Sequence, residues 1–137
     1  MKRFLTALVA LVLLMTSSLA LAEDYAYMIG HYGGFTGAVA TAGSNGRDAI
    51  LLAIKLWNEK GGVLGGKIGI ELYDDGSTTE GAVKGVSYLL DQVGVDGLIG
   101  SQLSGNIQAT GDLVEAYQIP EVATGMNPAW LQKGWTY

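Results

Sequence analysis

The feature that most constrains the fold of this chain is the alternation of short apolar runs with helix-length segments from Tyr27 onward. Each run is short enough for a strand, and the segments between runs are long enough for helical crossovers. This alternation predicts an α/β fold, a doubly wound parallel sheet with helices on both faces and right-handed connections. The predicted strands are Tyr27–Tyr32, Lys67–Tyr73, the apolar pair Leu98–Ile99 and Glu121–Ala123, and Trp135–Tyr137 opens a fifth.

Three helical patterns connect these strands. The first, Ala42–Lys60, is apolar over much of its circumference, so it is expected to be well buried, with Trp57 in the core. The second follows Ser77-Thr78-Thr79-Glu80, whose spacing predicts a capping box in which Ser77 and Glu80 bond each other's backbone N–H groups. The third runs from Ile107 to Tyr117.

A loop follows each of the first four strands, and in a parallel sheet these loops meet at one edge. Ser104 is the predicted N-cap of the third helix. A helix start at that edge presents free N–H groups and a positive dipole end, which suit a small carboxylate. The alternative is that Ser104 only caps its helix. The four loops are Gly33–Gly37, Asp74–Thr78, Ser101–Asn106 and Thr124–Asn127.

Charge and composition exclude several classes of function. The formal net charge is −5, so nucleic acid is not an expected partner. With no cysteine and one histidine, the chain can form no disulfide, no thiolate nucleophile and no multi-histidine zinc site. We expect neither a cofactor nor a bound metal.

The first 22 residues have the pattern of a secretory signal peptide. Lys2 and Arg3 form a positive start, an apolar core runs from Ala7 to Met15, and Ala20-Leu21-Ala22 has the small-x-small spacing of a cleavage site. The alternative, a membrane anchor, needs about 20 apolar residues, roughly twice the length of that core. Cleavage after Ala22 would release an acidic, exported protein that begins at Glu23.

No catalytic set emerges from the motifs. Gly61–Lys67 has the glycine and lysine spacing of a P-loop, but Ile68 cannot ligate magnesium and the order of helix and strand is reversed, so a connecting turn is predicted. Asp74 and Asp75 are adjacent and should point apart, which favours roles in a turn, a cap or a supporting contact. His31 is predicted to be a satisfied strand residue. No serine lies in a nucleophile elbow, so we do not expect an enzyme.

Several segments, in this order, resemble the amino-terminal lobe of type I periplasmic solute-binding proteins. The resemblance is to the leucine/isoleucine/valine (branched-chain amino acid) binding branch, which feeds ABC importers, and it covers nearly all of the chain from Tyr27 onward. The segments are Gly33-Gly34-Phe35-Thr36-Gly37, Trp57 to Lys67, Glu71-Leu72-Tyr73-Asp74-Asp75, Ile99-Gly100 with its serine-rich loop, and Thr124-Gly125-Met126-Asn127-Pro128.

The resemblance implies a periplasmic receptor with two lobes that close on an amino acid or a similar small ligand, and a membrane permease as its partner. Ser104 matches the serine that binds the ligand carboxylate, and Thr124 matches the position whose carbonyl binds the ammonium. Met126 falls where the family commonly has a hydroxyl residue, so only its backbone N–H remains for the ligand. Ala42 stands where some relatives place an aromatic ring. These two departures favour a larger or less conventional ligand, such as a short amide or an aromatic acid.

The domain organisation expected from the resemblance is a signal peptide over residues 1–22 and an incomplete lobe over residues 23–137, with the second lobe absent. Such a chain is not expected to close on a ligand. Two other functions stay open. One is the ligand-sensing ectodomain of a receptor, which uses the same lobes, and the other is a flavodoxin-like or hydrolase-like enzyme domain, which would need a cofactor loop or a nucleophile.

Overall fold

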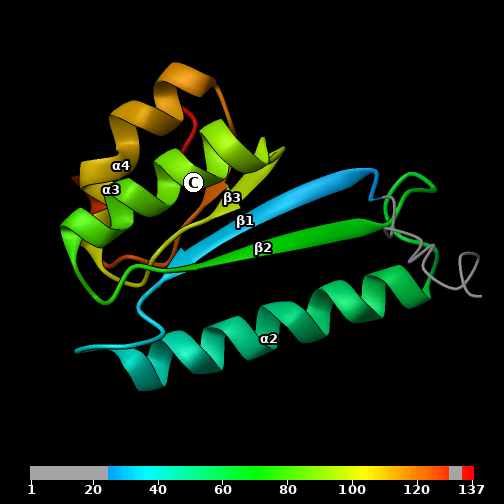
Figure 1. Ribbon diagram of the computed structural model, residues 1–137, viewed down its shortest axis with the longest axis horizontal. Helices are drawn as coiled ribbons and strands as arrows, with labels where there is room; N and C mark the ends of the chain where they lie inside the picture. The colour runs from blue at the N-terminus through cyan, green and yellow to red at the C-terminus, as the bar shows by residue number, and fades with distance from the viewer. Residues whose placement is uncertain (1–24, 130–133) are drawn as a thin grey trace, which may run out of the picture.

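The computed structural model describes residues 25–129 and 134–137, and it confirms the alternation of strands and helices (Figure 1). The predicted signal peptide lies outside the described residues. The elements in chain order are β1 (Tyr27–Gly33), α2 (Ala40–Glu59), β2 (Ile68–Asp74), α3 (Thr79–Tyr88), the π-helical turn η2 (Leu89–Val93), β3 (Gly97–Ile99), α4 (Ser104–Tyr117) and β4 (Glu121–Val122).

The strands form one parallel sheet in the order β2-β1-β3-β4. Beyond β4, Thr136 pairs with Glu121 in parallel, which places the expected fifth strand at that edge. Helix α2 lies on one face of the sheet, and α3 and α4 lie on the other (Figure 1). The prediction of a doubly wound parallel sheet is therefore confirmed, and the loops that follow the strands all lie at its carboxyl edge.

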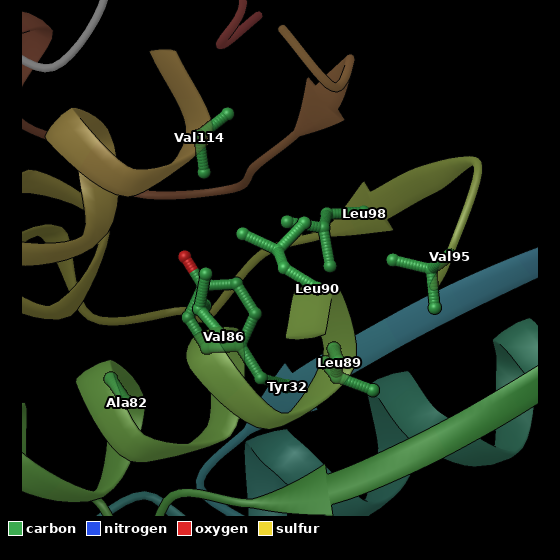
Figure 2. Close-up of a cluster of buried hydrophobic side chains, with 8 residues drawn as sticks. All are labelled: Tyr32, Ala82, Val86, Leu89, Leu90, Val95, Leu98 and Val114. Atoms are coloured by element: carbon green, nitrogen blue, oxygen red, sulfur yellow. The ribbon is translucent and has the colours of Figure 1, made fainter. Parts of the chain in front are cut away.

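The main hydrophobic core fills the space between the sheet and helices α3 and α4 (Figure 2). Strand alternation turns Tyr32 toward this core and His31 toward the opposite face. Helix α3 approaches the sheet closely at Gly85, where a β-carbon would lie only 2.4 Å from the Tyr73 ring. The fully buried members of the cluster include Tyr32, Ala82, Val86, Leu89 and Val114.

The prediction that the first helix is well buried is wrong for the described residues. Gly43 is the one buried residue of α2, while the side chains of Leu52, Leu56 and Trp57 are 56%, 46% and 55% exposed. The helix packs on β1 and β2 with one side, and the exposed residues lie away from that contact. Its wide apolar pattern therefore exceeds the area that one sheet face can cover, and Trp57 lies outside the core.

The helix starts differ from the predicted caps in their details. The N-cap of α3 is Thr78, whose hydroxyl accepts a hydrogen bond from the Gly81 N–H at 3.0 Å. A capping box between Ser77 and Glu80 is therefore wrong by one residue, because the third helical position is a glycine without a side chain to return the bond. Ser77 instead accepts from the Val39 N–H at 3.1 Å and donates to the Thr36 carbonyl at 2.7 Å.

The glycine-rich segment before β2 is a connecting turn, as predicted. Val63 and Gly66 exchange backbone hydrogen bonds of 2.8 Å each, which closes a two-residue turn. Its central residues, Leu64 and Gly65, both have left-handed φ angles, 49° and 83°. Such angles suit hairpin turns and give no phosphate-binding loop. In the described parts of the chain, no helix is long and apolar enough to cross a membrane.

Candidate functional site

Side-chain hydrogen bonds connect the loops at the carboxyl edge of the sheet to one another. The first connection is made by Asp74, at the end of β2, whose carboxylate binds the loop that follows β1. Its carboxylate accepts from the N–H groups of Phe35 and Thr36, at 2.9 and 3.1 Å, and from the Thr36 hydroxyl at 2.7 Å. Partial desolvation opposes ionisation of Asp74, but these bonds and one from the Gly76 N–H outweigh it and lower its pKa.

The second connection is made by Asp75, which is buried at 2% exposure. Its carboxylate accepts from the Ser101 hydroxyl at 3.0 Å, the Asn106 amide at 2.9 Å and the Ser77 N–H at 2.7 Å. The loop after β2 is thereby bonded to the loop after β3 and to the first turn of α4. Asp74 and Asp75 point to different partners, which confirms that they do not form a shared carboxylate site.

The third connection is made by Ser104, at the start of α4. The predicted capping role is wrong, because the N-cap is Leu103 and makes no side-chain capping bond, so Ser104 is the first residue of α4. The Ser104 hydroxyl instead accepts a hydrogen bond from the Asn127 N–H at 3.1 Å, in the loop after β4. The first turn of α4 contains no acidic residue. The Asn106 and Ile107 N–H groups donate to the Leu103 carbonyl at 2.9 and 3.2 Å, while the N–H groups of Ser104 and Gly105 precede the first intrahelical acceptor. A positive helix end therefore lies where the third and fourth loops meet.

Thr124 and Met126 belong to the loop that contacts Ser104. Both side chains are exposed, that of Met126 by 96%. The structure therefore brings the three predicted ligand-binding residues to one edge of the sheet, two of them on the loop that binds the hydroxyl of the third. Ala42, at which some relatives have an aromatic residue, is exposed on the first turn of α2.

A buried carboxyl group beneath this edge was missed at the level of the sequence. Glu121 is 0% exposed, and its Oε1 accepts from the Tyr32 hydroxyl at 2.5 Å, while its Oε2 accepts from the Thr136 hydroxyl at 3.0 Å. The Tyr32 hydroxyl also lies 3.0 Å from the Thr110 hydroxyl. Desolvation by burial raises the pKa of Glu121 despite these bonds, and desolvation together with Glu121 raises that of Tyr32 well above its ordinary value. Alternation alone placed Glu121 at the start of a strand, without indicating on which face.

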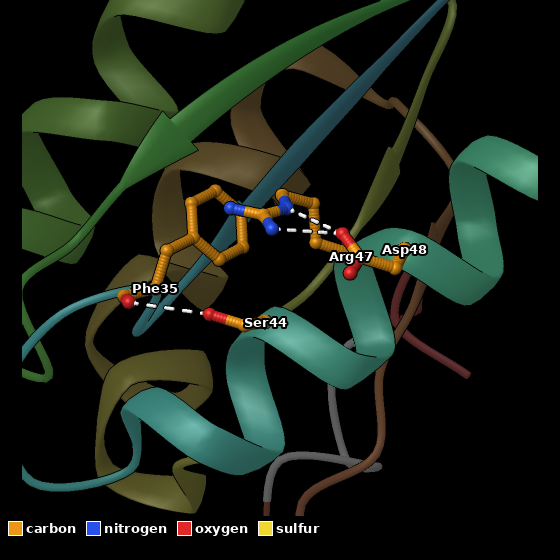
Figure 3. A network of polar contacts seen from close by, with 4 residues as sticks. All are labelled: Phe35, Ser44, Arg47 and Asp48. Carbon is orange, nitrogen blue, oxygen red and sulfur yellow. Dashed lines mark hydrogen bonds and ion pairs between the residues drawn. The ribbon is translucent and has the colours of Figure 1, made fainter.

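The opposite face of the sheet carries a second polar group near the same edge. His31 Nδ1 lies 3.0 Å from the Ile99 carbonyl oxygen, and its ring stands 5.2 Å from that of Phe35. The Arg47 guanidinium lies 5.6 Å from the Phe35 ring centre and pairs with Asp48 at 2.8 Å (Figure 3). Burial lowers the pKa of His31, although the Ile99 carbonyl and Asp75 act in the opposite direction. The neutral ring is thus favoured.

Metal chemistry has no evident site on these residues. Across residues 25–129 and 134–137, no cluster of three or more His, Asp or Glu side chains is placed to hold a metal ion. The carboxylates of Asp74, Asp75 and Glu121 are each engaged by hydroxyl or N–H donors. The edge offers hydrogen-bond donors around the start of a helix, which suits reversible binding of a small polar molecule.

Comparison with known proteins decides the family. Residues 26–137 match the periplasmic binding protein family. The chain belongs to this family. The curated relatives include the leucine-specific-binding protein of Salmonella typhimurium, which is 33% identical over 134 residues, covering 96% of this chain and 35% of the relative. The chain thus spans about a third of the length of the curated relatives that it matches.

Solved structures of periplasmic binding proteins share the fold. A periplasmic binding protein type 1 from Bordetella pertussis Tohama I is 34% identical and superposes with a TM-score of 0.73, over 78% of this chain and 29% of that one. The branched-chain amino acid transporter substrate binding protein LivJ of Streptococcus pneumoniae, in complex with isoleucine, has a TM-score of 0.78 at 21% identity, over 81% and 32% of the two chains. A Rhodopseudomonas palustris solute binding protein of an ABC transporter, in complex with 3,4-dihydroxybenzoic acid, has a TM-score of 0.74 at 21% identity, over 80% and 30%.

These relatives are solute-binding proteins, and the resemblance to the type I family that the sequence indicated is confirmed. The match identifies the α/β architecture as part of a type I periplasmic binding protein fold. Periplasmic binding proteins such as these relatives are extracytoplasmic.

Proposed function

We propose that this chain is the ligand-binding amino-terminal lobe of an extracytoplasmic solute-binding protein that serves an ABC importer. The observation that carries the proposal is the contact between Ser104 and the loop after β4. It places one hydroxyl and the first N–H groups of α4 beside a loop with further backbone donors and acceptors. A ligand carboxylate at this place would be held by hydrogen bonds and by the helix dipole.

Ser104 is proposed to bind the carboxylate, and the Thr124 carbonyl to bind an ammonium group of the ligand. Met126 would contribute its N–H, while its exposed thioether side chain offers an adaptable apolar contact. The exposed Ala42 leaves room at the edge for a larger group. An amino acid is supported by relatives named for leucine and branched-chain amino acid binding, and an aromatic acid by the relative bound to 3,4-dihydroxybenzoic acid.

The proposal extends to the rest of the transport system. Residues 1–22 would act as the export signal and residues 23–137 as the lobe that remains after cleavage. A complete receptor would need a second lobe to close over the ligand, and a membrane permease of an ABC transporter would receive it. Since only one lobe is described, this chain by itself is expected to bind its ligand weakly.

The test is a titration of the uniformly ¹⁵N-labelled chain with L-leucine, L-isoleucine or 3,4-dihydroxybenzoate, followed by amide chemical shifts. One lobe supplies only part of the contacts, so we expect a dissociation constant on the order of 1 mM or weaker, about 4 kcal/mol of binding. The shifts should be confined to the amides of residues 104–106 and 124–127. Ser104→Ala should weaken binding, whereas Ser87→Ala, on α3, should leave it unchanged.

Two results would contradict the proposal. If none of the three compounds shifts these amides at about 50 mM, well above the expected constant, the edge is not a binding site for this ligand class. If binding is micromolar by calorimetry, the expectation that one lobe cannot close on a ligand is wrong.

A further inference from the structure

Helix α2 has an apolar stripe that the fold leaves exposed to solvent. Its four members stand at positions i, i+3, i+4 and i+7, which share one face of a helix, and all are exposed: Ala49, Leu52, Ala53 and Leu56. The residues turned toward the sheet are others, since Gly43 is buried and Ile50 and Ile54 are half-buried. Among the described helices, α2 stands alone on its face of the sheet (Figure 1). Packing on the sheet therefore does not account for this second stripe.

Exposure of large apolar side chains is concentrated on this helix. In the described ranges, α2 exposes four such side chains, including Leu52 and Leu56, whereas α3 and α4 expose one each, the tyrosines Tyr88 and Tyr117 at their last residues. Apolar patches of more than a few hundred Å² are rare on monomeric proteins. Leucines one turn apart, with alanines small enough for a close approach between them, are typical of the surface on which another helix packs.

The charged residues beside the stripe indicate which helix it takes. Asp48 and Lys55 lie seven residues apart, each directly before a member of the stripe, so both are on the same flank of it. Their side chains are 65% and 70% exposed, although Asp48 pairs with Arg47 at 2.8 Å and Lys55 pairs with Glu59 at 3.9 Å. Exposed pairs of this kind contribute little to stability, so both charges are available to a new partner.

A second copy of α2, packed antiparallel, matches this pattern. Asp48 and Lys55 are placed symmetrically about a point beside Leu52. If a twofold axis passes through that point, Asp48 of each copy lies opposite Lys55 of the other copy, because residues of antiparallel helices run past one another in reverse order. A parallel pair would instead set Asp48 opposite Asp48 and Lys55 opposite Lys55. Opposite charges therefore favour the antiparallel arrangement, and like charges disfavour the parallel one.

We propose that the exposed stripe of α2 is a self-association surface, on which a second copy of this chain packs with its own α2 antiparallel. The contact is isologous, so both copies contribute the same stripe and the pair of Asp48 with Lys55 forms twice. A single pair of helices is smaller than a standard interface of about 800 Å² per partner. We therefore expect a dissociation constant on the order of 10 µM. The inference uses no residue of the proposed ligand site and is independent of that proposal.

The first test is sedimentation equilibrium of the full chain from about 1 to 300 µM, which brackets the expected constant. Asp48→Lys sets like charges opposite each other twice and should weaken the dimer about tenfold, as should Lys55→Asp. The double variant Asp48→Lys/Lys55→Asp restores opposite charges and should regain the wild-type constant. Lys84→Asp, at an exposed position on α3, is the matched control and should leave the constant unchanged. Unfolding measured at about 1 µM reports the monomer, because the dimer dissociates there.

The second test is cysteine cross-linking, which reports the register of the two helices because the chain contains no cysteine. The position of Leu52 lies beside the twofold axis, so Leu52→Cys should form a disulfide between the two copies. The position of Leu56, on the same stripe, is displaced by about 13 Å along the helix from its own counterpart, so Leu56→Cys should not. A parallel pair of helices would cross-link at both positions.

Three outcomes would overturn the proposal. The first is a chain that stays monomeric at about 300 µM, far above the expected constant, so that the stripe serves another occupant. The second is the same dissociation constant for the wild type and for both single charge variants, which would place association elsewhere on the chain. The third is cross-linking of Leu56→Cys as readily as of Leu52→Cys. If a charge reversal prevents folding, Lys55→Ala removes the same pair and should weaken the dimer in the same direction.

Discussion

Replacing Glu121 by glutamine should stabilise the protein at neutral pH. The carboxyl group is 0% exposed, and its described partners, Tyr32 and Thr136, are uncharged hydroxyls. Ionising it therefore costs desolvation free energy that no cation returns. Glutamine has nearly the same shape and keeps a carbonyl oxygen for one of the two hydroxyls. The substitution removes a buried charge, but the glutamine amide brings hydrogens that need acceptors. The net effect should be a gain of about 1–2 kcal/mol in the free energy of unfolding.

The pH dependence gives this prediction its sign. Burial raises the pKa of Glu121 in the folded state above its value in the unfolded chain, about 4.3. Between these two values the folded state binds more protons than the unfolded state, so stability falls as the pH rises. The favourable contribution is complete below the unfolded value and is lost as the pH passes the folded value. Glu121→Gln removes this slope, so its advantage over the wild type should grow from pH 4.5 to pH 8.

The assay is urea unfolding followed by tryptophan fluorescence at several pH values across that range. Glu59→Gln, at an exposed position near the end of α2, is the matched control and should show the pH dependence of the wild type. If Glu121→Gln is less stable than the wild type at pH 7, or if the difference between them is constant from pH 4.5 to pH 8, the argument from the buried charge is wrong.

Three further substitutions test other parts of the structure by urea unfolding. Asp75→Ala should lower the free energy of unfolding by about 3 kcal/mol or more, because the Ser101 hydroxyl, the Asn106 amide and the Ser77 N–H lose their acceptor. A loss below about 1 kcal/mol would contradict the view that Asp75 connects these loops. Thr78→Ala should lower the free energy of unfolding by about 1 kcal/mol, because it removes the N-cap of α3. Ser77→Ala is the control and should leave that cap in place. If the Gly81 amide is equally protected from hydrogen exchange in the wild type and in Thr78→Ala, Thr78 is not the cap. Leu56→Lys, on the outer surface of α2, should change stability by no more than about 0.5 kcal/mol, and a loss above about 2 kcal/mol would show that this surface is covered.

Much of the candidate site could be located from the sequence. A parallel sheet collects the loops that follow its strands at one edge, so the sequence predicts that Ser104, Thr124 and Met126 lie there. The hydrogen bond between Ser104 and Asn127 joins two of these loops directly. The role of Asp75 was less accessible, because its partners Ser101 and Asn106 lie 26 and 31 residues away and no local pattern connects them.

The predicted helix caps were wrong where a serine hydroxyl could bind either the helix start or a loop distant in sequence. Ser77 and Thr78 are both good capping residues, and the choice between them depends on Ser77 binding the loop that follows β1. Ser104 is likewise a good cap in isolation, but its hydroxyl is used by the Asn127 N–H. In each case a contact distant in sequence determined which hydroxyl the helix start received.

The sequence by itself determined the class of fold, the order of its elements and the edge at which the candidate site lies, because apolar periodicity and crossover length depend on neighbouring residues alone. Only the tertiary structure decided which apolar and polar groups are buried. It left the outer surface of α2 exposed and enclosed Glu121 with two hydroxyls. Burial is a property of what packs against a residue, and those partners lie on other elements of the chain.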